Sequence, residues 1–422
     1  MTESKKALGA RTRTTGEHAM SHQVSQYDCV IVGGGPAGMM AGLLLARAGV
    51  NVCVLEKHPD FLRDFRGDTI HPSTMQLMDE LGIIDRFLAI PHRRMSTVSV
   101  ASPARETVFA DFSRLPKPYN YVALMPQWDF LDFVADTATE YDNFQLIREA
   151  TVTDLITDGD QVRGVRYQTP DGDAETTAQL VIGADGRHST VRTQASLTPR
   201  ESDAPMDVLW FRISRQPTES VPFVSTGDGF AAVAVDRGSY WQIAYCIPKG
   251  EYANLRSQGT QLIAERIKTA LPIIAERFLE EITSWDNLKL LTVSVNRLER
   301  WHRNGLLCIG DAAHAMSPAG GVGINLAIQD AVAAARILGP TLAEGKVPEE
   351  RLLSRVQRRR EWSARIIQAG QVKILADLYP KHLNEKYTPP KATKIIRNSP
   401  FLQKVVARVI GIGLRPEHIG QR

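Results

Sequence analysis

The sequence predicts an α/β fold that carries a mainly β insertion and ends in a helical region, and two observations support this prediction. The first is an apolar run at residues 28–32, followed at once by glycines, a helix-like segment at 39–48 and a second apolar run at 52–55. This order is typical of a β-α-β unit with parallel, buried strands. The second is the enrichment of β-branched and aromatic residues at 207–213 and 240–247, which predicts an inserted sheet.

The remaining elements follow from the same periodicity rules. We expect a helix at 72–88 that is stopped near Gly82, strands within 151–167, buried strands at 180–182 and 306–309, an Ala-rich helix at 323–338 and a basic helical region from 349 onward. The 422 residues are enough for two or three structural units. The expected units are a disordered extension at 1–26, a discontinuous Rossmann-like domain at 27–200 and 294–345, a β-sheet domain at 201–293 and a helical region at 346–422.

The composition excludes several classes of protein. A hydrophobic fraction of 43% supports a large core, and a net charge of +3 is too small for the concentrated basic face of a nucleic-acid-binding protein. None of the four cysteines forms a Cys-x-x-Cys pair, so no metal site is expected, and buried free thiols suit a reducing compartment. No apolar run reaches the roughly 18 residues of a transmembrane helix. We therefore expect a cytoplasmic protein.

A glycine-rich turn opens the first predicted helix. The segment at 33–38, Gly-Gly-Gly-Pro-Ala-Gly, fits G-x-G-x-x-G and stands between a predicted strand and a predicted helix. Gly33 permits the tight turn, Gly35 lets the backbone approach a pyrophosphate, and Gly38 lets helix and strand pack closely. Glu56 ends the second strand, where it can accept hydrogen bonds from ribose hydroxyls. A purely structural turn is the alternative, and this motif alone does not separate FAD from NAD.

Two further motifs follow buried strands. Gly183-Ala184-Asp185-Gly186 comes after the run at 180–182, and Gly310-Asp311-Ala312-Ala313-His314 comes after the run at 306–309, before a glycine-rich stretch at 317–325 that opens the Ala-rich helix. With the first motif, in this order and spacing, they resemble the para-hydroxybenzoate hydroxylase family of FAD-dependent monooxygenases, the single-component aromatic hydroxylases. The resemblance covers about residues 28–338.

The resemblance implies a Rossmann-like FAD-binding domain and assigns residues to the cofactor. Asp311 is expected to accept a hydrogen bond from the ribityl chain, and the helix that begins near Gly321 to direct its positive N-terminus at the flavin N1–C2=O edge. A helix N-cap is the alternative for Asp311, and a cap in a strand-to-helix turn is the alternative for Asp185. The expected cofactor-binding residues are Gly33, Gly35, Pro36, Ala37, Gly38, Glu56, Lys57, Arg66, Gln127, Val152, Asp185, Gly310, Asp311, Pro318, Gly321, Gly323 and Asn325.

Three of these assignments rest on position within the family pattern alone. Arg66 lies where the family carries an arginine near the cofactor phosphates, and a solvated arginine is the alternative. Gln127 falls where many relatives have arginine, so its flavin contact is in question. Val152 begins a strand that touches the adenine through its backbone in relatives.

The function implied by the resemblance is hydroxylation of an aromatic or quinone-like small molecule. NADH or NADPH would reduce FAD, and oxygen would be transferred through a flavin C4a-hydroperoxide. The sequence has no second glycine-rich strand-to-helix motif, so the nicotinamide would bind transiently. The alternatives are an FAD-dependent reductase of a prenyl or quinone substrate on the same fold, and a flavin-binding protein with little turnover. The pattern names no catalytic base, because the flavin carries the chemistry.

The inserted sheet is expected to cover the substrate. Trp210, Arg212, Gln242 and Tyr245 are the candidate pocket residues, although only one face of each strand can point inward and the sequence does not say which. A second open question concerns the stretch 392–413, where basic and apolar residues interleave. It can be a helix docked on the body with a solvated basic face, which we favour, or an interfacial helix at a membrane surface.

Overall fold

The computed structural model describes residues 25–62, 69–102, 105–202, 204–378, 388 and 391–420. The expected α/β class is confirmed, with a parallel sheet at its centre. The main path of this first sheet consists of β1 (Ser25–Val32), β2 (Val52–Leu55), β8 (Phe144–Ile147), β11 (Gly172–Gly183), β19 (His302–Arg303) and β20 (Leu306–Cys308), in the spatial order β19-β20-β11-β1-β2-β8. Two further strands, β10 (Gln161–Thr169) and β9 (Thr151–Asp158), join it by antiparallel pairing of β10 with β11. Strand β1 begins inside the stretch expected to be an extension; residues 1–24 lie outside the described part of the chain.

Side-chain alternation in the central strands gives each face of this sheet its own core. One face, with Ile31 and Ile182, packs against helices α1 (Pro36–Arg47), α4 (Gln127–Ala138) and α9 (Val322–Ala343). The other face, with Val30 and Val181, packs against strands β9 (Thr151–Asp158) and β10 (Gln161–Thr169) and the short helix α5 (Thr190–Gln194). Because both faces are covered, the strands are apolar throughout, as expected for a parallel sheet.

The second sheet contains more of the chain than the sequence suggests. Its order is β17 (Lys289–Leu291), β13 (Met206–Ser214), β16 (Tyr240–Pro248), β15 (Phe230–Asp236), β14 (Val224–Gly227), β5 (Thr97–Ser102) and β6 (Arg105–Asp111). The β5–β6 pair therefore corrects the expectation that residues 27–200 serve the first domain alone. The physical reason is edge pairing, since Val100 and Ala101 lie in parallel register with Val224 and Ser225.

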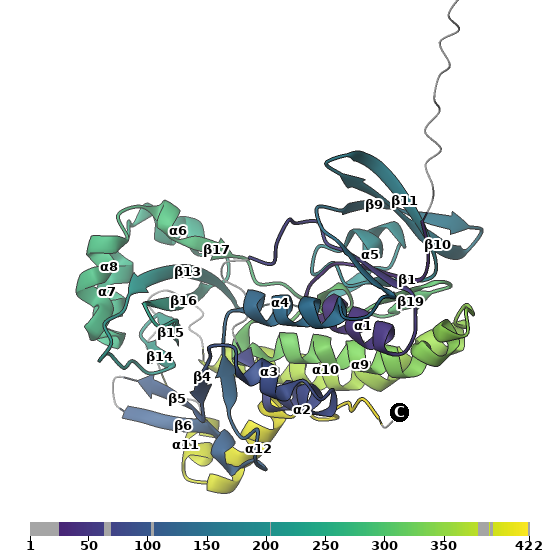
Figure 1. Cartoon of the computed structure of the whole chain (residues 1–422). Coiled ribbons are helices and arrows are strands. Elements are labelled where there is room, and N and C mark those ends of the chain that lie inside the picture. The colour runs from purple at the N-terminus through teal and green to yellow at the C-terminus, as the bar shows by residue number, and fades with distance from the viewer. Residues whose placement is uncertain are drawn as a thin grey trace, which may run out of the picture.

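Three helices cover the outer face of this second sheet. They are α6 (Tyr252–Ser257), α7 (Gln261–Ala270) and α8 (Pro272–Glu281), which form the left edge of the molecule in Figure 1. Phe211 of β13 meets Phe278 of α8 edge to face, with ring centroids 5.2 Å apart. The other face meets Ala319, which precedes α9, and Val372 of α10 (Glu350–Leu378).

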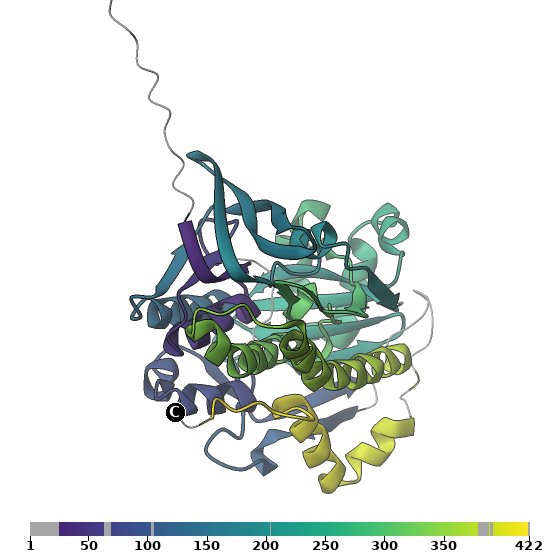
Figure 2. The same cartoon turned by 90° about the vertical axis from the view of Figure 1, so that its right-hand side faces the viewer.

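Short elements and the C-terminal helices complete the body. The short elements are β3 (Thr69–Ile70), β4 (Arg93–Met95), β7 (Val122–Leu124), β12 (Pro199–Ser202), β18 (Val295–Leu298), α2 (Pro72–Glu80), α3 (Ile84–Leu88) and the 3-10 turns η1 (Phe112–Arg114), η2 (Trp285–Asn287), η3 (Gly310–Ala312) and η4 (Ala319–Gly321). Helix α10 (Glu350–Leu378) runs beside α9, and both views show the pair crossing the molecule (Figures 1 and 2). In the described ranges, one stretch, Ala319–Ala343, is long and apolar enough to cross a membrane, but 72% of its 18-residue apolar window is buried, as in a core helix.

The last two helices lie below the second sheet. Helix α11 (Lys391–Arg397) precedes α12 (Pro400–Gly411), which packs on β6 and η1. Ala407 is fully buried against Phe112, whereas Phe401 points outward and is 71% exposed. One side of α12 is thus docked on the body, in line with the favoured alternative, and its membrane role stays untested.

Candidate functional site

The three glycine motifs meet at the carboxyl ends of three neighbouring parallel strands. Register pairs Val32 with Gly183 and Gly183 with Cys308, so the turns that follow these residues lie side by side. A Cβ built at Gly33 would lie 2.5 Å from the Ala184 carbonyl oxygen, and one at Gly310 would lie 3.0 Å from the Ala37 Cβ. The motifs, distant in sequence, therefore form one continuous edge, where open α/β sheets bind ligands.

The first motif presents a helix N-terminus without a side-chain cap. Gly35 is the N-cap of α1, Pro36 follows at the first helical position, and no side chain caps the helix. A Cβ at Gly35 would meet nothing within 4 Å, whereas one at Gly38 would lie 1.9 Å from the Gly33 carbonyl oxygen. The structure thus has open space beside the uncapped N–H groups and close packing behind them, which fits a phosphate-binding turn.

Glu56 stands at the end of β2 beside this turn. Its carboxylate accepts hydrogen bonds from the Gly34 N–H at 2.7 Å and from the His58 N–H at 3.1 Å. The Glu56 carbonyl accepts the Ala150 N–H at 2.9 Å, which brings the start of β9, where Val152 is buried, next to the acidic residue. Lys57 is exposed, and the predicted Arg66 lies outside the described residues.

Asp185, in the second motif, is engaged with the helix that follows it. Its carboxylate accepts the Ser189 hydroxyl at 2.5 Å and the Val191 N–H at 3.1 Å, both at the start of α5. Burial raises the pKa of Asp185, and these hydrogen bonds oppose the shift. The contacts are those of the turn-forming alternative. The family role in FAD and nicotinamide binding stays a prediction.

Asp311, in the third motif, is placed differently. Gly310 adopts φ +58°, a left-handed conformation that favours glycine, and it begins the 3-10 turn η3 in which Asp311 is half-buried. Asp311 caps no helix, and its carboxylate has no hydrogen-bond or ion-pair partner among the described residues. A polar carboxylate at this edge with open acceptor positions suits a hydroxyl-bearing ligand.

The glycine-rich loop before α9 is held by residues that sequence reasoning missed. A Cβ at Gly321 would lie 2.2 Å from the Thr69 Oγ1, and the Thr69 hydroxyl donates to the Gly321 carbonyl at 3.2 Å. The Asn325 side-chain oxygen accepts the Thr74 hydroxyl at 2.7 Å and the His71 N–H at 3.2 Å. Asn325 therefore joins α9 to α2.

The open side of this loop faces away from those contacts. Gly323 has open space at its Cβ position, and Pro318 is exposed. No side chain caps α9, whose N-cap is Gly321. The fold therefore has a second helix N-terminus without a side-chain cap, and its role toward the flavin N1–C2=O edge stays a prediction.

The inner face of the second sheet meets the same loop. Ala319 packs against a core cluster that includes Val208, Ala231, Ala244 and Cys246, which line this face with small apolar side chains. Strand alternation and register place Trp210, Arg212 and Gln242 on it, since Trp210 pairs with Ala244 and Arg212 pairs with Gln242. Tyr245 belongs to the opposite face, where it stacks on Phe230 under α7 and α8. We therefore exclude Tyr245 as a pocket residue.

Two of the remaining candidates differ in environment. Gln242 is 1% exposed, and its Nε2 has no hydrogen-bond partner within the described ranges. Gln127 is the first residue of α4, and the adjacent Trp128 carries the Arg237 guanidinium 5.5 Å from its ring centroid. Arg237 comes from the β15–β16 turn, so α4 and the second sheet meet close to Gln127.

The sequence contains a signal for one of the buried polar groups behind the site. Asp330 is the one carboxylate in the Ala-rich helix α9, and it is buried. Because charged residues are almost never buried without partners, its position in the sequence predicts a buried ion pair. Arg192 donates to the Ala312 carbonyl at 3.2 Å and so ties α5 to the third motif. Burial lowers the pKa of His71 to about 4, although its Nδ1 lies 2.8 Å from the Ile410 carbonyl oxygen. No group of metal-ligating side chains occurs in the described part of the chain.

Comparisons with known proteins agree with this geometry. Residues 26–370 match the FAD binding domain family. The chain is 30% identical over 383 residues to 6-methylpretetramide 4-monooxygenase from Streptomyces rimosus, which covers 90% of this chain and 91% of that protein. It is 25% identical to para-nitrophenol 4-monooxygenase from Pseudomonas sp. (strain WBC-3), over 75% of this chain and 78% of the relative. Among solved structures, p-nitrophenol 4-monooxygenase PnpA from Pseudomonas putida DLL-E4 superposes with a TM-score of 0.73 at 20% identity, covering 94% and 100% of the two chains.

Proposed function

Because the chain belongs to the FAD binding domain family and is an FAD-dependent monooxygenase, we propose that it hydroxylates a flat phenolic or quinone-like compound bound against the inner face of the second sheet. The observation that carries this proposal is the contact of Ala319 with that face, because it sets the glycine loop of the third motif against the small apolar side chains. An aromatic ring that lies there is next to the place of the flavin.

We assign the three motifs to three parts of FAD. The pyrophosphate lies at the N-terminus of α1, where Gly35 leaves room, and the adenosine ribose lies against Glu56. Asp311 accepts a hydrogen bond from the ribityl chain, and the N-terminus of α9 faces the flavin ring. Bound FAD supplies oxygen activation after reduction by NADH or NADPH, which binds transiently. The protein's own task is to orient the substrate and to exclude water.

The substrate class follows from the polarity of the inner face. Val208, Ala231, Ala244 and Cys246 are small or branched apolar residues that lie buried, so the lining of this face is apolar. A relative that covers most of the chain is named for an action on 6-methylpretetramide, which supports a large aromatic substrate. Gln242 adds a buried donor without a partner, and a substrate carbonyl or phenolic oxygen would satisfy it.

The test is isotope incorporation with a panel of fused-ring phenols and quinones. The purified enzyme is given NADH or NADPH and ¹⁸O-labelled oxygen gas, and products are analysed by mass spectrometry. We expect nicotinamide oxidation that the substrate stimulates and a product that carries one labelled oxygen atom. A hydrogenated product without label would instead support the reductase alternative, and the assignment to hydroxylation would fall.

A further inference from the structure

A buried cluster of charged side chains lies directly behind the third motif. Asp330, on α9, and Arg360, on α10, each have a side chain that is 1% exposed, and Glu417, in the C-terminal segment, is fully buried. The Asp330 carboxylate accepts the Gly310 N–H at 3.1 Å and lies 2.5 Å from the His314 Nε2. Asp330 thus contacts both ends of the segment that contains Asp311.

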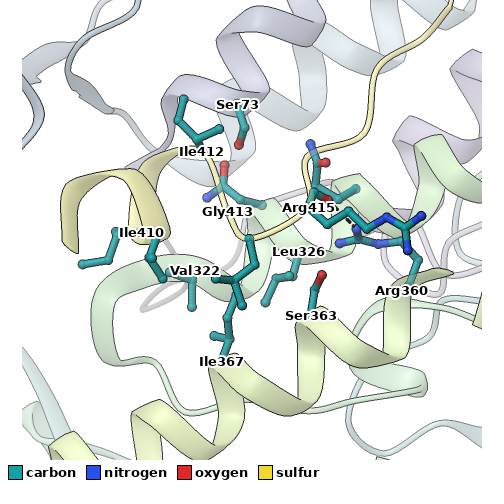
Figure 3. A pocket seen from close by; sticks show the side chains of 14 residues that line it. Ser73, Val322, Leu326, Arg360, Ser363, Ile367, Ile410, Ile412, Gly413 and Arg415 are labelled. Carbon is teal, nitrogen blue, oxygen red and sulfur yellow. Dashed lines mark hydrogen bonds between the residues drawn. The ribbon is translucent and has the colours of Figure 1, made fainter. Parts of the chain in front are cut away.

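Arg360 extends this cluster to the end of the chain. Its Nε lies 3.0 Å from the second Asp330 carboxylate oxygen, and its Nη1 donates to the Arg415 carbonyl at 3.0 Å. The same Nη1 lies 3.5 Å from the Glu417 carboxylate. Figure 3 shows Arg360 of α10 beside Arg415, at the edge of a small cavity between α9, α10 and the C-terminal segment.

Glu417 is held from several sides. Its carboxylate accepts Arg359 Nε at 2.6 and 2.8 Å and Arg336 Nη1 at 3.2 Å, and its backbone N–H donates to the Gln329 side chain. The guanidinium groups around Glu417 stabilise this buried carboxylate, because their pairing replaces the hydration that Glu417 loses. Removing the Glu417 charge takes one of two carboxylate partners from Arg360, whose side chain is 1% exposed.

The surrounding charges keep Asp330 ionised. Burial would raise the pKa of Asp330, but the charges and hydrogen bonds of His314 and Arg360 outweigh it and lower that pKa. An ionised Asp330 is a strong acceptor for the Gly310 N–H, which holds the left-handed glycine before Asp311.

We propose that Glu417 is a positioning residue for the flavin site, acting through Arg360 and Asp330 on the Gly310–Asp311 turn. This inference rests on the assignment of Asp311 to the ribityl chain. A C-terminal segment far from the motifs in sequence thereby contributes to FAD affinity without touching FAD.

The test compares two ligands on the apoprotein. ADP fills only the place assigned to the pyrophosphate and adenosine, whereas FAD also reaches Asp311. In Glu417→Gln we expect FAD binding to weaken about tenfold, within the range of coupling between distant side chains. ADP binding should not change, and Glu417→Asp should restore most of the FAD affinity because it keeps the charge.

The matched control is Glu80→Gln. Glu80 also holds the C-terminal segment, through the His418 Nδ1 at 2.5 Å and the Ile419 N–H at 2.7 Å, but it has no contact with Arg360. FAD affinity should be unaffected in this variant. If Glu417→Gln does not fold, Arg360→Lys tests the same link, since lysine keeps the charge and loses the fork of donors.

Three results would overturn the inference. They are unchanged FAD affinity in Glu417→Gln, equal weakening of ADP and FAD, and a loss in Glu80→Gln as large as that in Glu417→Gln. None of these results bears on the proposed hydroxylation. That proposal fails only if the wild-type protein does not bind FAD or does not incorporate oxygen.

Discussion

The proposed cofactor site on the first sheet and the proposed substrate site on the second sheet are built from different parts of the chain. In the first sheet the backbone carries the site, since Cβ atoms at Gly33 and Gly38 would lie 2.5 Å and 1.9 Å from backbone oxygens. In the second sheet side chains form the proposed substrate site, and the three atoms nearest to the Cβ position of Gly227 all belong to the Phe230 ring, the first at 2.5 Å. A site made of backbone restricts residue type at fixed positions. A site made of side chains requires only that the residues alternate along each strand so that the right side chains point to the binding face.

The largest effect is expected when one methyl group is added to the first motif, because this tests whether the cofactor site depends on close approach of the backbone. In Gly33→Ala the new Cβ meets the Ala184 carbonyl in a residue at φ +105°, so we expect a loss of about 4 kcal/mol or more and no FAD binding. Urea unfolding and titration with FAD would measure both effects.

Gly49→Ala is the matched control for that change. Gly49 also has a positive φ, +84°, but its Cβ position is open, so only the conformational cost of about 1–2 kcal/mol is expected. Equal losses in the two variants would show that conformation, rather than close approach of the motifs, explains the glycine.

The two regions also differ in their expected response to pH. His71 and His302, whose pKa values burial lowers to about 4, both lie on the cofactor side. Between pH 6.5 and 4 the unfolded chain binds a proton that folded His71 does not. Stability is therefore complete above pH 6.5 and is lost as the pH falls toward 4, by about 3 kcal/mol for His71.

Urea unfolding at several pH values would measure this loss. His71→Asn keeps a donor near the Ile410 carbonyl and removes the titration, so its stability should depend less on pH than that of the wild type. His188→Asn, at an exposed position, serves as the control and should follow the wild type. A His71→Asn curve as steep as the wild type would contradict the prediction.

The sequence predicts the cofactor region better than it predicts the second sheet. The glycines at 33–38 and the Asp311 motif predict where the cofactor edge forms, because few residue types allow those backbone paths. The face of Tyr245 and the pairing of β5 with β14 were not predictable, because alternation allows either face and edge pairing depends on distant strands. Arg360, the partner of Asp330 on α10, in turn meets Glu417 of the C-terminal segment, and no local pattern links these three residues.

Asp311 sharpens the comparison within the cofactor region, since it is a side chain in a site made mostly of backbone. If it accepts a ribityl hydroxyl, Asp311→Ala should weaken FAD binding by about 10- to 100-fold and leave ADP binding unchanged. Asp311→Asn keeps an acceptor and should lose less. Apoprotein titration with both ligands is the measurement, and wild-type FAD affinity in the alanine variant would remove Asp311 from the site.

Gln242 and Tyr245 give the smallest expected effect and the cleanest separation of the two faces of the second sheet. Gln242 lies on the inner face with an unpaired Nε2, so Gln242→Leu should raise the KM for the aromatic substrate about three- to tenfold, the loss of one hydrogen bond, without changing FAD affinity. Tyr245→Phe removes a hydroxyl from the outer face and should leave KM unchanged. The opposite pattern would mean that substrate reaches the helix-covered face, which the position of Ala319 argues against.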